Sequence, residues 1–148
     1  MQMPDVNVLV YAHRADDPAH AFYREWLEAV VNGPAPFGLS VLTIGGFLRL
    51  VTNPRVFPNP TPLPIALATV DSLTARRGAR VLAPGAGHLE ILSRLCRATR
   101  ATGKLVADAQ HAAVAIEHGC HLVTRDRDFA AFQAHGLRWE HLAPVGAG

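Results

Sequence analysis

The sequence has few of the features that mark secreted or membrane proteins. Its 148 residues include only two cysteines, Cys96 and Cys120. Each lies in an apolar segment, so we expect two buried, reduced thiols rather than a disulfide. No apolar run approaches the roughly 18–20 residues that are needed to cross a bilayer. Residues 1–5 contain no basic stretch followed by an apolar one, so we expect no signal peptide and a cytoplasmic protein.

Lysine is also scarce, since Lys104 is the only one. A phosphoacceptor domain of the receiver or phosphatase type needs a second acid beside its strand-end aspartate, or an Asp-x-Asp pair. Val6 and Asn7 follow Asp5, so both patterns fail, and no lysine marks a later strand end. The sequence therefore argues against this class.

The composition is that of an ordinary globular protein, with 49% apolar and 18% charged residues. This length and composition predict one domain over residues 1–148. The net charge of +2 divides unevenly, because the chain up to Thr74 carries −2 and the remainder +4. Basic residues recur every three or four positions late in the chain, at Arg94, Arg97, Arg100 and Lys104. On one helix they would form a basic stripe, which is either a solvated face or a surface that contacts a polyanion.

Helical and extended segments alternate along the chain. Apolar periodicity and capping residues predict helices over residues 18–32, 41–51, 65–77, 88–102, 106–118 and 128–135. Strands are predicted over residues 37–39, 80–84, 120–124 and 137–142. Residues 6–10 fit either a strand or the first turn of a helix, and five prolines between Asn53 and Pro64 predict a surface loop. This alternation predicts an α/β fold with a central, mainly parallel sheet flanked by helices.

Acidic residues stand at the ends of predicted strands or on adjoining helices. Asp5 follows the first extended segment, Asp126 follows residues 122–124 with Asp128 two positions on, and Asp108 opens the helix after Gly103. The carboxyl ends of parallel strands form the functional crevice of such sheets. Carboxylates that converge there repel each other unless a cation compensates. Hard oxygen ligands suit Mg²⁺ or Mn²⁺, which can polarise a phosphodiester and activate water.

Each acid also has a purely structural interpretation. Asp108 could be a first-turn residue favoured by the helix dipole, and Asp126 could be the N-cap of the short helix that follows it. Asp5 could cap the turn after the first strand. Spacing alone leaves both interpretations open.

Three stretches resemble the PIN-domain family, and within it the VapC toxins. Residues 5–12 are similar to the opening of the family, an acid followed by one residue, Asn and an apolar run. Residues 106–115 resemble its central helix, Asp-Ala followed by small apolar residues. Residues 122–129 resemble its Thr-x-Asp-x-Asp-Phe signature. The order and spacing of the three match over essentially the whole chain.

The resemblance implies a PIN-like α/β fold with a parallel sheet between helices. It also implies a Mg²⁺-dependent endoribonuclease, with Mn²⁺ as a possible substitute, that cleaves structured RNA such as tRNA or ribosomal RNA. A VapB-type antitoxin would inhibit the enzyme. The toxin would form a homodimer, and a heterotetramer or larger assembly with its antitoxin.

The resemblance also assigns roles to individual residues. Asp5 and Asp108 would be metal ligands, and Asp126 a third catalytic acid. Three residues would support them: Asn7 by bracing Asp5, Thr124 by hydrogen bonding within the acidic cluster, and Asp128 as a further acid. Four arginines are candidates for contacts with RNA or antitoxin, although each could be merely solvated: Arg49, Arg55, Arg125 and Arg127.

One position departs from the family pattern. The family usually places a glutamate on the second helix, where this chain has Gly46, which suggests a VapC subgroup that lacks the acid. Its loss should weaken metal affinity, because water or the substrate phosphate must take its place. Glu90 could substitute, although a surface position is the simpler interpretation. The alternative hypothesis is a degenerate module that binds RNA or antitoxin without cleaving RNA.

Overall fold

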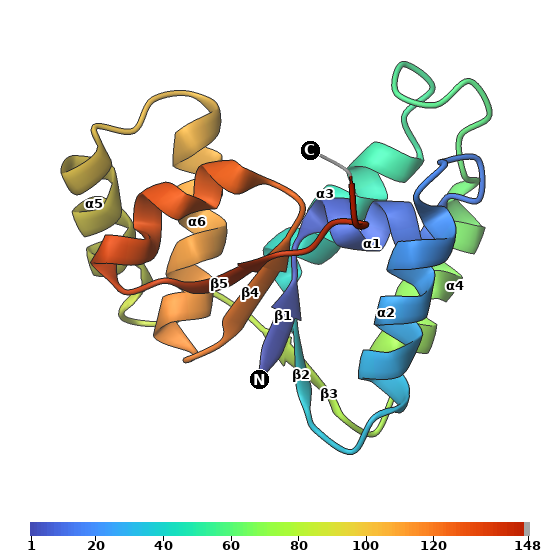
Figure 1. Ribbon diagram of the computed structural model, residues 1–148, viewed down its shortest axis with the longest axis horizontal. Helices are drawn as coiled ribbons and strands as arrows, with labels where there is room; N and C mark the ends of the chain where they lie inside the picture. The colour runs from blue at the N-terminus through green and yellow to red at the C-terminus, as the bar shows by residue number, and fades with distance from the viewer. Residues whose placement is uncertain (147–148) are drawn as a thin grey trace.

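The structure is a computed structural model that describes residues 1–146 and contains one five-stranded sheet (Figure 1). The strands are β1 Gln2–Pro4, β2 Phe37–Ser40, β3 Ala79–Leu82, β4 His121–Thr124 and β5 Arg138–His141. The helices are α1 Val6–His13, α2 His20–Asn32, α3 Val41–Val51, α4 Leu63–Thr74, α5 His88–Thr99 and α6 Lys104–Glu117, and η1 Arg127–His135 is a 3₁₀ helix. Residues 147 and 148, which the predicted domain includes, lie outside the described part. Within residues 1–146 no helix is long and apolar enough to cross a membrane.

The sheet has the order β3-β2-β1-β4-β5, and every neighbouring pair is parallel. This confirms the predicted α/β class. β1 and β4 lie side by side at its centre, with Met3 paired to Leu122 and Pro4 to Val123. The backbone N–H of Asp5 continues this ladder by donating to the Val123 carbonyl at 2.8 Å. The residues that follow these two strands therefore meet at one edge of the sheet.

Helices cover both faces of the sheet, with α1 to α4 on one side and α5, α6 and η1 on the other (Figure 1). Consecutive strand residues point to opposite faces, so Leu122 joins the core beneath α6 while Val123 joins the core beside α1 and α2. The small, fully buried residues of α6 bring this helix close to the sheet: Ala109, Ala112, Ala113 and Ala115. The position of α6 brings Asp108 close to the end of β4.

Residues 6–10 prove to be helical, as part of α1. Asp5 is the N-cap of this helix and accepts a 2.7 Å hydrogen bond from the Val6 N–H. The side chains of Val8, Leu9 and Val10 are all buried, because α1 packs against both α2 and α3. A helix that is apolar on most sides carries no clear 3.6-residue signal, which explains why the sequence pattern was ambiguous.

Three predicted helix starts are shifted by two residues, and one of them is that of α6, which begins at Lys104 instead of residue 106. Asp17 does not cap α2, which begins at His20; its carboxylate instead accepts from the Ala19 N–H at 2.8 Å within the preceding turn. α4 begins at Leu63 and includes Pro64, so the proline-rich loop is shorter than predicted. Proline is tolerated in a first helical turn because its missing N–H would have no partner there.

The predicted basic stripe is wrong. Arg94 and Arg97 lie on α5, but this helix ends at Thr99 and Arg100 adopts a left-handed conformation with φ of 53°. Lys104 is the first residue of the next helix, α6. The four side chains therefore do not share one helical face. Both cysteines are free, as expected, with Cys120 buried and Cys96 partly exposed.

Candidate active site

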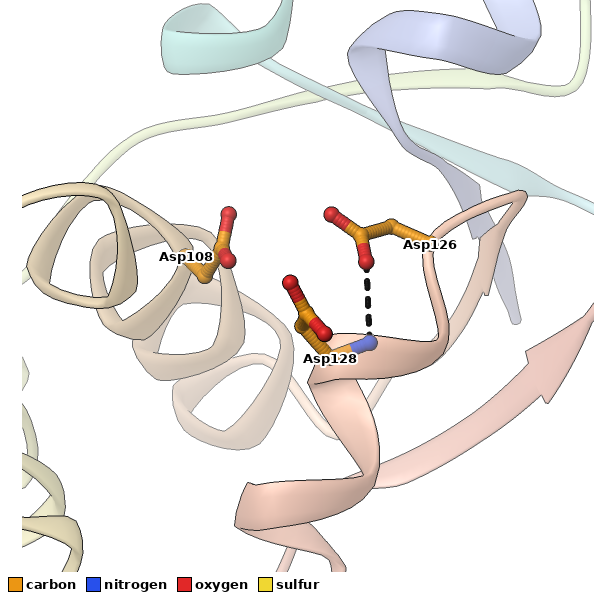
Figure 2. Close-up of side chains that lie close together, drawn as sticks. All are labelled: Asp108, Asp126 and Asp128. Atoms are coloured by element: carbon orange, nitrogen blue, oxygen red, sulfur yellow. Dashed lines mark hydrogen bonds between the residues drawn. The ribbon is translucent and has the colours of Figure 1, made fainter.

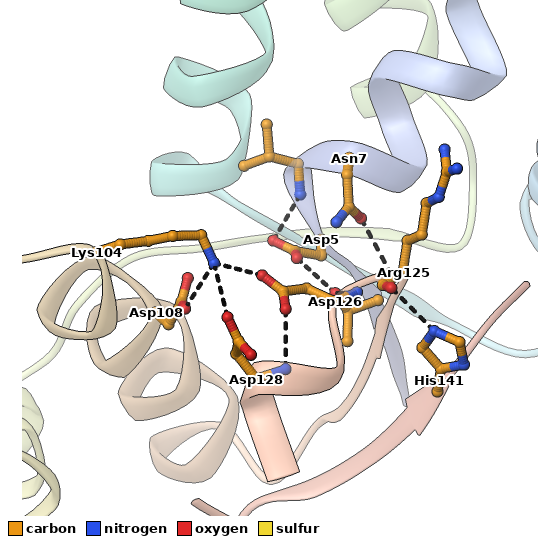
Figure 3. Close-up of polar contacts among 10 residues, drawn as sticks. Asp5, Asn7, Lys104, Asp108, Arg125, Asp126, Asp128 and His141 are labelled. Carbon is orange, nitrogen blue, oxygen red and sulfur yellow. Dashed lines mark hydrogen bonds and ion pairs between the residues drawn. The ribbon is translucent and has the colours of Figure 1, made fainter. Parts of the chain in front are cut away.

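Four aspartates gather at the carboxyl end of the central strands (Figure 3). Asp5 follows β1, and Asp126 follows β4 as the N-cap of η1. Asp108 reaches them from α6, and Asp128 lies in the first turn of η1. Asp108, Asp126 and Asp128 each offer a carboxylate oxygen within 4.8 Å of the other two (Figure 2).

Asp5 is the most buried of the four aspartates. Its side chain is only 6% exposed, and its second oxygen accepts a 2.7 Å hydrogen bond from the Thr124 hydroxyl. The same hydroxyl accepts from the Asp126 N–H at 2.9 Å. Thr124, which is fully buried, therefore ties the residues after β1 and β4 together.

The structural interpretation holds for Asp126 but not for Asp108. Oδ1 of Asp126 accepts from the Asp128 N–H at 2.8 Å, so this residue is indeed a cap, while its Oδ2 faces the cluster. Asp108 is the fifth residue of α6, since the helix begins at Lys104. It is too far along the helix to be a first-turn acid, and that interpretation is wrong.

Lys104 is the residue of this site that the sequence did not indicate. Its Nζ donates to Asp126 at 2.5 Å, to Asp108 at 3.2 Å and to Asp128 at 3.4 Å (Figure 3). Its spacing to Asp108 is i to i+4 on one helix, which is favourable for an ion pair. That spacing is the signal in the sequence that points to Lys104, because a lysine four residues before Asp108 on one helix can reach its carboxylate.

The surroundings change the proton affinities of these groups. Burial raises the pKa of Asp108, and the neighbouring Lys104 only partly offsets this. Burial acts in the same direction on Asp126, but the hydrogen bonds from Lys104 and from the Asp128 N–H outweigh it and lower the pKa of Asp126. The hydrogen bonds to Asp126 and Asp108 raise the pKa of Lys104. The ammonium group is thus firmly protonated among carboxylates.

Asn7 makes a different contact from the one expected. Its Oδ1 accepts from the Arg125 N–H at 3.3 Å instead of bracing Asp5 (Figure 3). Asn7 therefore fixes the turn that carries Asp126. No hydrogen bond joins Asn7 to Asp5 among the described residues, so the expected contact is not formed.

The four candidate arginines fall into two groups. Arg125 and Arg127 flank Asp126, and the Arg125 guanidinium lies 4.4 Å from the centroid of the Tyr11 ring. Arg49 lies in the last turn of α3 and Arg55 in the loop after it, and both are exposed. Only the first pair adjoins an acid of the cluster in the sequence, and the Arg125 guanidinium itself lies over the Tyr11 and Tyr23 rings.

Position 46 is packed against the start of α1. A Cβ added to Gly46 would lie 2.9 Å from Cγ2 of Val6, the residue after Asp5. α3 and α1 thus approach closely where the family glutamate would fall. Glu90 is exposed in the first turn of α5 and does not belong to the group of close carboxylates in residues 1–146.

These residues suit a hard divalent cation. Asp108, Asp126 and Asp128 supply only carboxylate oxygens, which Mg²⁺ and Mn²⁺ prefer. The spread of at most 4.8 Å among their ligand atoms is small enough for a single ion. The ammonium of Lys104 already shows that the oxygens attract positive charge.

A family model described as PIN domain matches residues 3–134. The chain belongs to the PIN-domain family. Among relatives of this PIN-domain protein, ribonuclease VapC43 of Mycobacterium tuberculosis is 45% identical over 137 residues, which are 93% of this chain and 92% of the relative. Ribonuclease VapC25 of the same organism is 42% identical over 132 residues, or 89% and 93% of the two chains. This level of identity places the chain in the VapC family.

A solved structure shows the same fold at lower identity. VapBC2 from Rickettsia felis, bound to a DNA fragment from its promoter, contains a chain that matches with a TM-score of 0.68 at 17% identity. The match covers 94% of this chain and 96% of that one. It confirms the predicted PIN-like architecture.

Proposed function

We propose that this protein is the toxin of a VapBC-type pair and acts as a metal-dependent endoribonuclease. The observation that carries the proposal is the convergence of Asp108, Asp126 and Asp128 beside the buried Asp5. It occurs in a chain whose relatives at 42–45% identity are named ribonucleases. The reaction is hydrolysis of an RNA phosphodiester, in which water adds to phosphorus and one P–O bond breaks.

Mg²⁺, with Mn²⁺ as a substitute, is the proposed cofactor, with Asp5 and Asp108 as ligands and Asp126 as the third acid. Asp128 is close enough to join Asp108 and Asp126 around one ion. When bound, a divalent ion polarises the phosphodiester and lowers the pKa of a water molecule. Asp5 keeps free lone pairs although each of its oxygens already accepts one hydrogen bond.

The surrounding residues orient these acids. Thr124 holds Asp5 and the Asp126 backbone in one geometry, and Asn7 fixes the backbone of Arg125. Arg125 and Arg127, on either side of Asp126, would contact RNA phosphates or an antitoxin, and Arg49 and Arg55 would extend that surface. Charge-assisted hydrogen bonds from guanidinium groups suit phosphate oxygens.

A structured RNA, such as tRNA or ribosomal RNA, is the proposed substrate and a VapB-type antitoxin the proposed inhibitor. The similarity to the VapBC2 structure from Rickettsia felis supports the second point. We further propose a homodimer that assembles with antitoxin into a heterotetramer or larger complex, and a subgroup whose site works without an acid at Gly46.

The test is cleavage of total cellular RNA by antitoxin-free protein with Mg²⁺, Mn²⁺ or EDTA. We expect fragments with either ion and none with EDTA. Asp5→Ala and Asp108→Ala should abolish cleavage, and Asp108→Asn removes one charge with little change in shape. Glu90→Gln is the matched control, because it removes an exposed acid on α5, and it should cleave like the wild type. Cleavage that persists in EDTA would refute the proposal.

A second candidate is a module that binds RNA or antitoxin without cleaving RNA. The observation in its favour is the packing of Gly46 against Val6, where any side chain at position 46 would require Val6 to shift. A folded wild-type protein that binds RNA but yields no fragments with either ion would establish this alternative.

A further inference from the structure

We propose that Lys104 competes with the divalent ion for the carboxylates, so that the ion binds only when the Lys104 ammonium leaves. The inference rests on the proposed function, because it concerns the same metal site. It makes Lys104 a residue that sets metal affinity instead of one that acts on RNA.

The hydrogen bonds of Lys104 are the first observation that supports this competition. Nζ of Lys104 donates to Oδ2 of Asp126, Asp108 and Asp128, with distances from 2.5 to 3.4 Å. These are the same three residues whose oxygens group closely enough to hold an ion. One ammonium therefore occupies the position from which all three carboxylates can be reached.

The two cations cannot share that position. Mg²⁺ binds carboxylate oxygens at about 2.0–2.1 Å and keeps several waters around it. An ammonium that stays hydrogen-bonded to the same oxygens would lie within a few ångström of the ion, where like charges repel strongly. Binding of the ion must therefore break the Lys104 contacts or be weakened by them.

Lys104 is far more exposed than two of the three acids, whereas Asp128 is as exposed as the lysine, at 67%. The Lys104 side chain is 65% exposed, whereas Asp108 and Asp126 are 11% and 23% exposed. Lys104 is also the first residue of α6, after Gly103 with its φ of +57°. Its flexible stem can turn into solvent without disturbing the core.

Amine labelling tests the displacement directly, because Lys104 is the only lysine. Acetic anhydride modifies amines that are free of such contacts, and mass spectrometry of the peptide around Lys104 reports the rate. We expect Mg²⁺ or Mn²⁺ to accelerate acetylation of Lys104 several-fold in the full chain. An added lysine peptide provides the internal reference, and Asp108→Asn together with Asp126→Asn should remove the effect of the ion.

Mn²⁺ binding gives a second, independent readout. Titration by calorimetry or electron paramagnetic resonance should show Lys104→Met binding Mn²⁺ about 3- to 30-fold more tightly than the wild type, as expected for the loss of exposed ion pairs. Lys104→Arg keeps the charge and should bind Mn²⁺ no more tightly than the wild type.

Thermal unfolding in EDTA gives a further readout. Without a divalent ion, Lys104→Met should unfold at a lower temperature than the wild type, because the carboxylates lose their nearest cation.

The outcomes separate this inference from the proposed function. If the wild type binds Mn²⁺ but Lys104→Met binds it equally or less tightly, the competition is refuted and the metal site stands. If Lys104→Met loses RNA cleavage at saturating Mn²⁺ with unchanged affinity, Lys104 acts on RNA and the inference is wrong. If Mn²⁺ binds no form of the protein, the proposed metal site itself fails.

Discussion

The two ends of α1 carry two charged clusters that differ in charge balance. At the C-terminal end, the Arg14 guanidinium makes two hydrogen bonds to the Asp16 carboxylate, at 3.0 and 2.7 Å. It also donates to the Asn59 carbonyl at 2.8 Å and to Thr61 at 3.2 Å, and it lies over the Phe57 ring. One cation, one anion and neutral acceptors thus form a closed set that anchors the loop of residues 53–62.

At the N-terminal end of α1, beginning with its N-cap Asp5, four carboxylates face one ammonium (Figure 3). Three of these carboxylates contact the same Lys104 ammonium, so four acids and one base leave a formal charge of −3 on the cluster. A balanced cluster such as that of Arg14 stabilises the fold, whereas an unbalanced one costs folding free energy unless a cation joins it. The comparison supports a structural role for the first cluster and is consistent with the cation site that we propose at the second.

The largest expected difference between the two clusters is in how a substitution changes the free energy of unfolding. Arg14→Gln should lower the free energy of unfolding by about 1–3 kcal/mol, because the Asn59 carbonyl and the Thr61 hydroxyl lose a buried donor. Asp108→Asn should leave it unchanged or raise it slightly, because it removes one of the surplus charges. Urea unfolding in EDTA measures both. Equal destabilisation by the two variants would contradict the distinction between the clusters.

A smaller effect is expected beneath the acidic cluster, where α3 meets α1. Gly46→Ala places a Cβ 2.9 Å from the Val6 side chain, and such overpacking costs about 1–3 kcal/mol. The better helix propensity of alanine returns up to about 1 kcal/mol. Gly45→Ala is the matched control, since nothing lies within 4 Å of its added Cβ.

Thermal unfolding should therefore rank Gly45→Ala at or above the wild type and Gly46→Ala below it. If Gly46→Ala were as stable as Gly45→Ala, then α1 and α3 could separate at little cost. The absence of a side chain at position 46 would in that case not be a requirement of packing.

The smallest effect concerns pH at the balanced cluster. Burial, followed by the charges of Arg14 and His20, lowers the pKa of His13 below its usual 6.5. Well above pH 6.5, the His13 side chain is neutral in both the folded and the unfolded chain. As the pH falls below 6.5, the unfolded chain binds the proton before the folded chain does. His13 therefore subtracts stability as the pH falls below 6.5.

Unfolding of the wild type and of His13→Gln between pH 7.5 and about 5 measures this contribution. The loss of stability on acidification should be smaller in the variant. Because His13 also contacts Thr61 at 3.0 Å, only the change in slope with pH bears on the prediction, and equal slopes would contradict it.

The sequence by itself determined the α/β class, most helices and the three motifs that carry the acids. These features rest on local signals: caps such as Ser40, whose side chain accepts from the Leu42 N–H, apolar periodicity, and glycines at helix ends. The rule that parallel strands end at the same edge of a sheet predicted that Asp5 and Asp126 lie at that edge, although the sequence left open whether they act as caps or as a site. Local signals suffice wherever the decisive contact is within a few residues.

Only the tertiary structure decided the contacts between distant segments. The turn after α5, with left-handed φ angles at Arg100 and Gly103, ends that helix and places Lys104 at the start of α6 beside the acids. Asn7 meets the backbone of Arg125, and Gly46 meets Val6, because strand pairing and helix packing bring them together. These contacts join segments that are far apart in the chain, and the spacing of residues along a sequence does not give the distance between such segments in space.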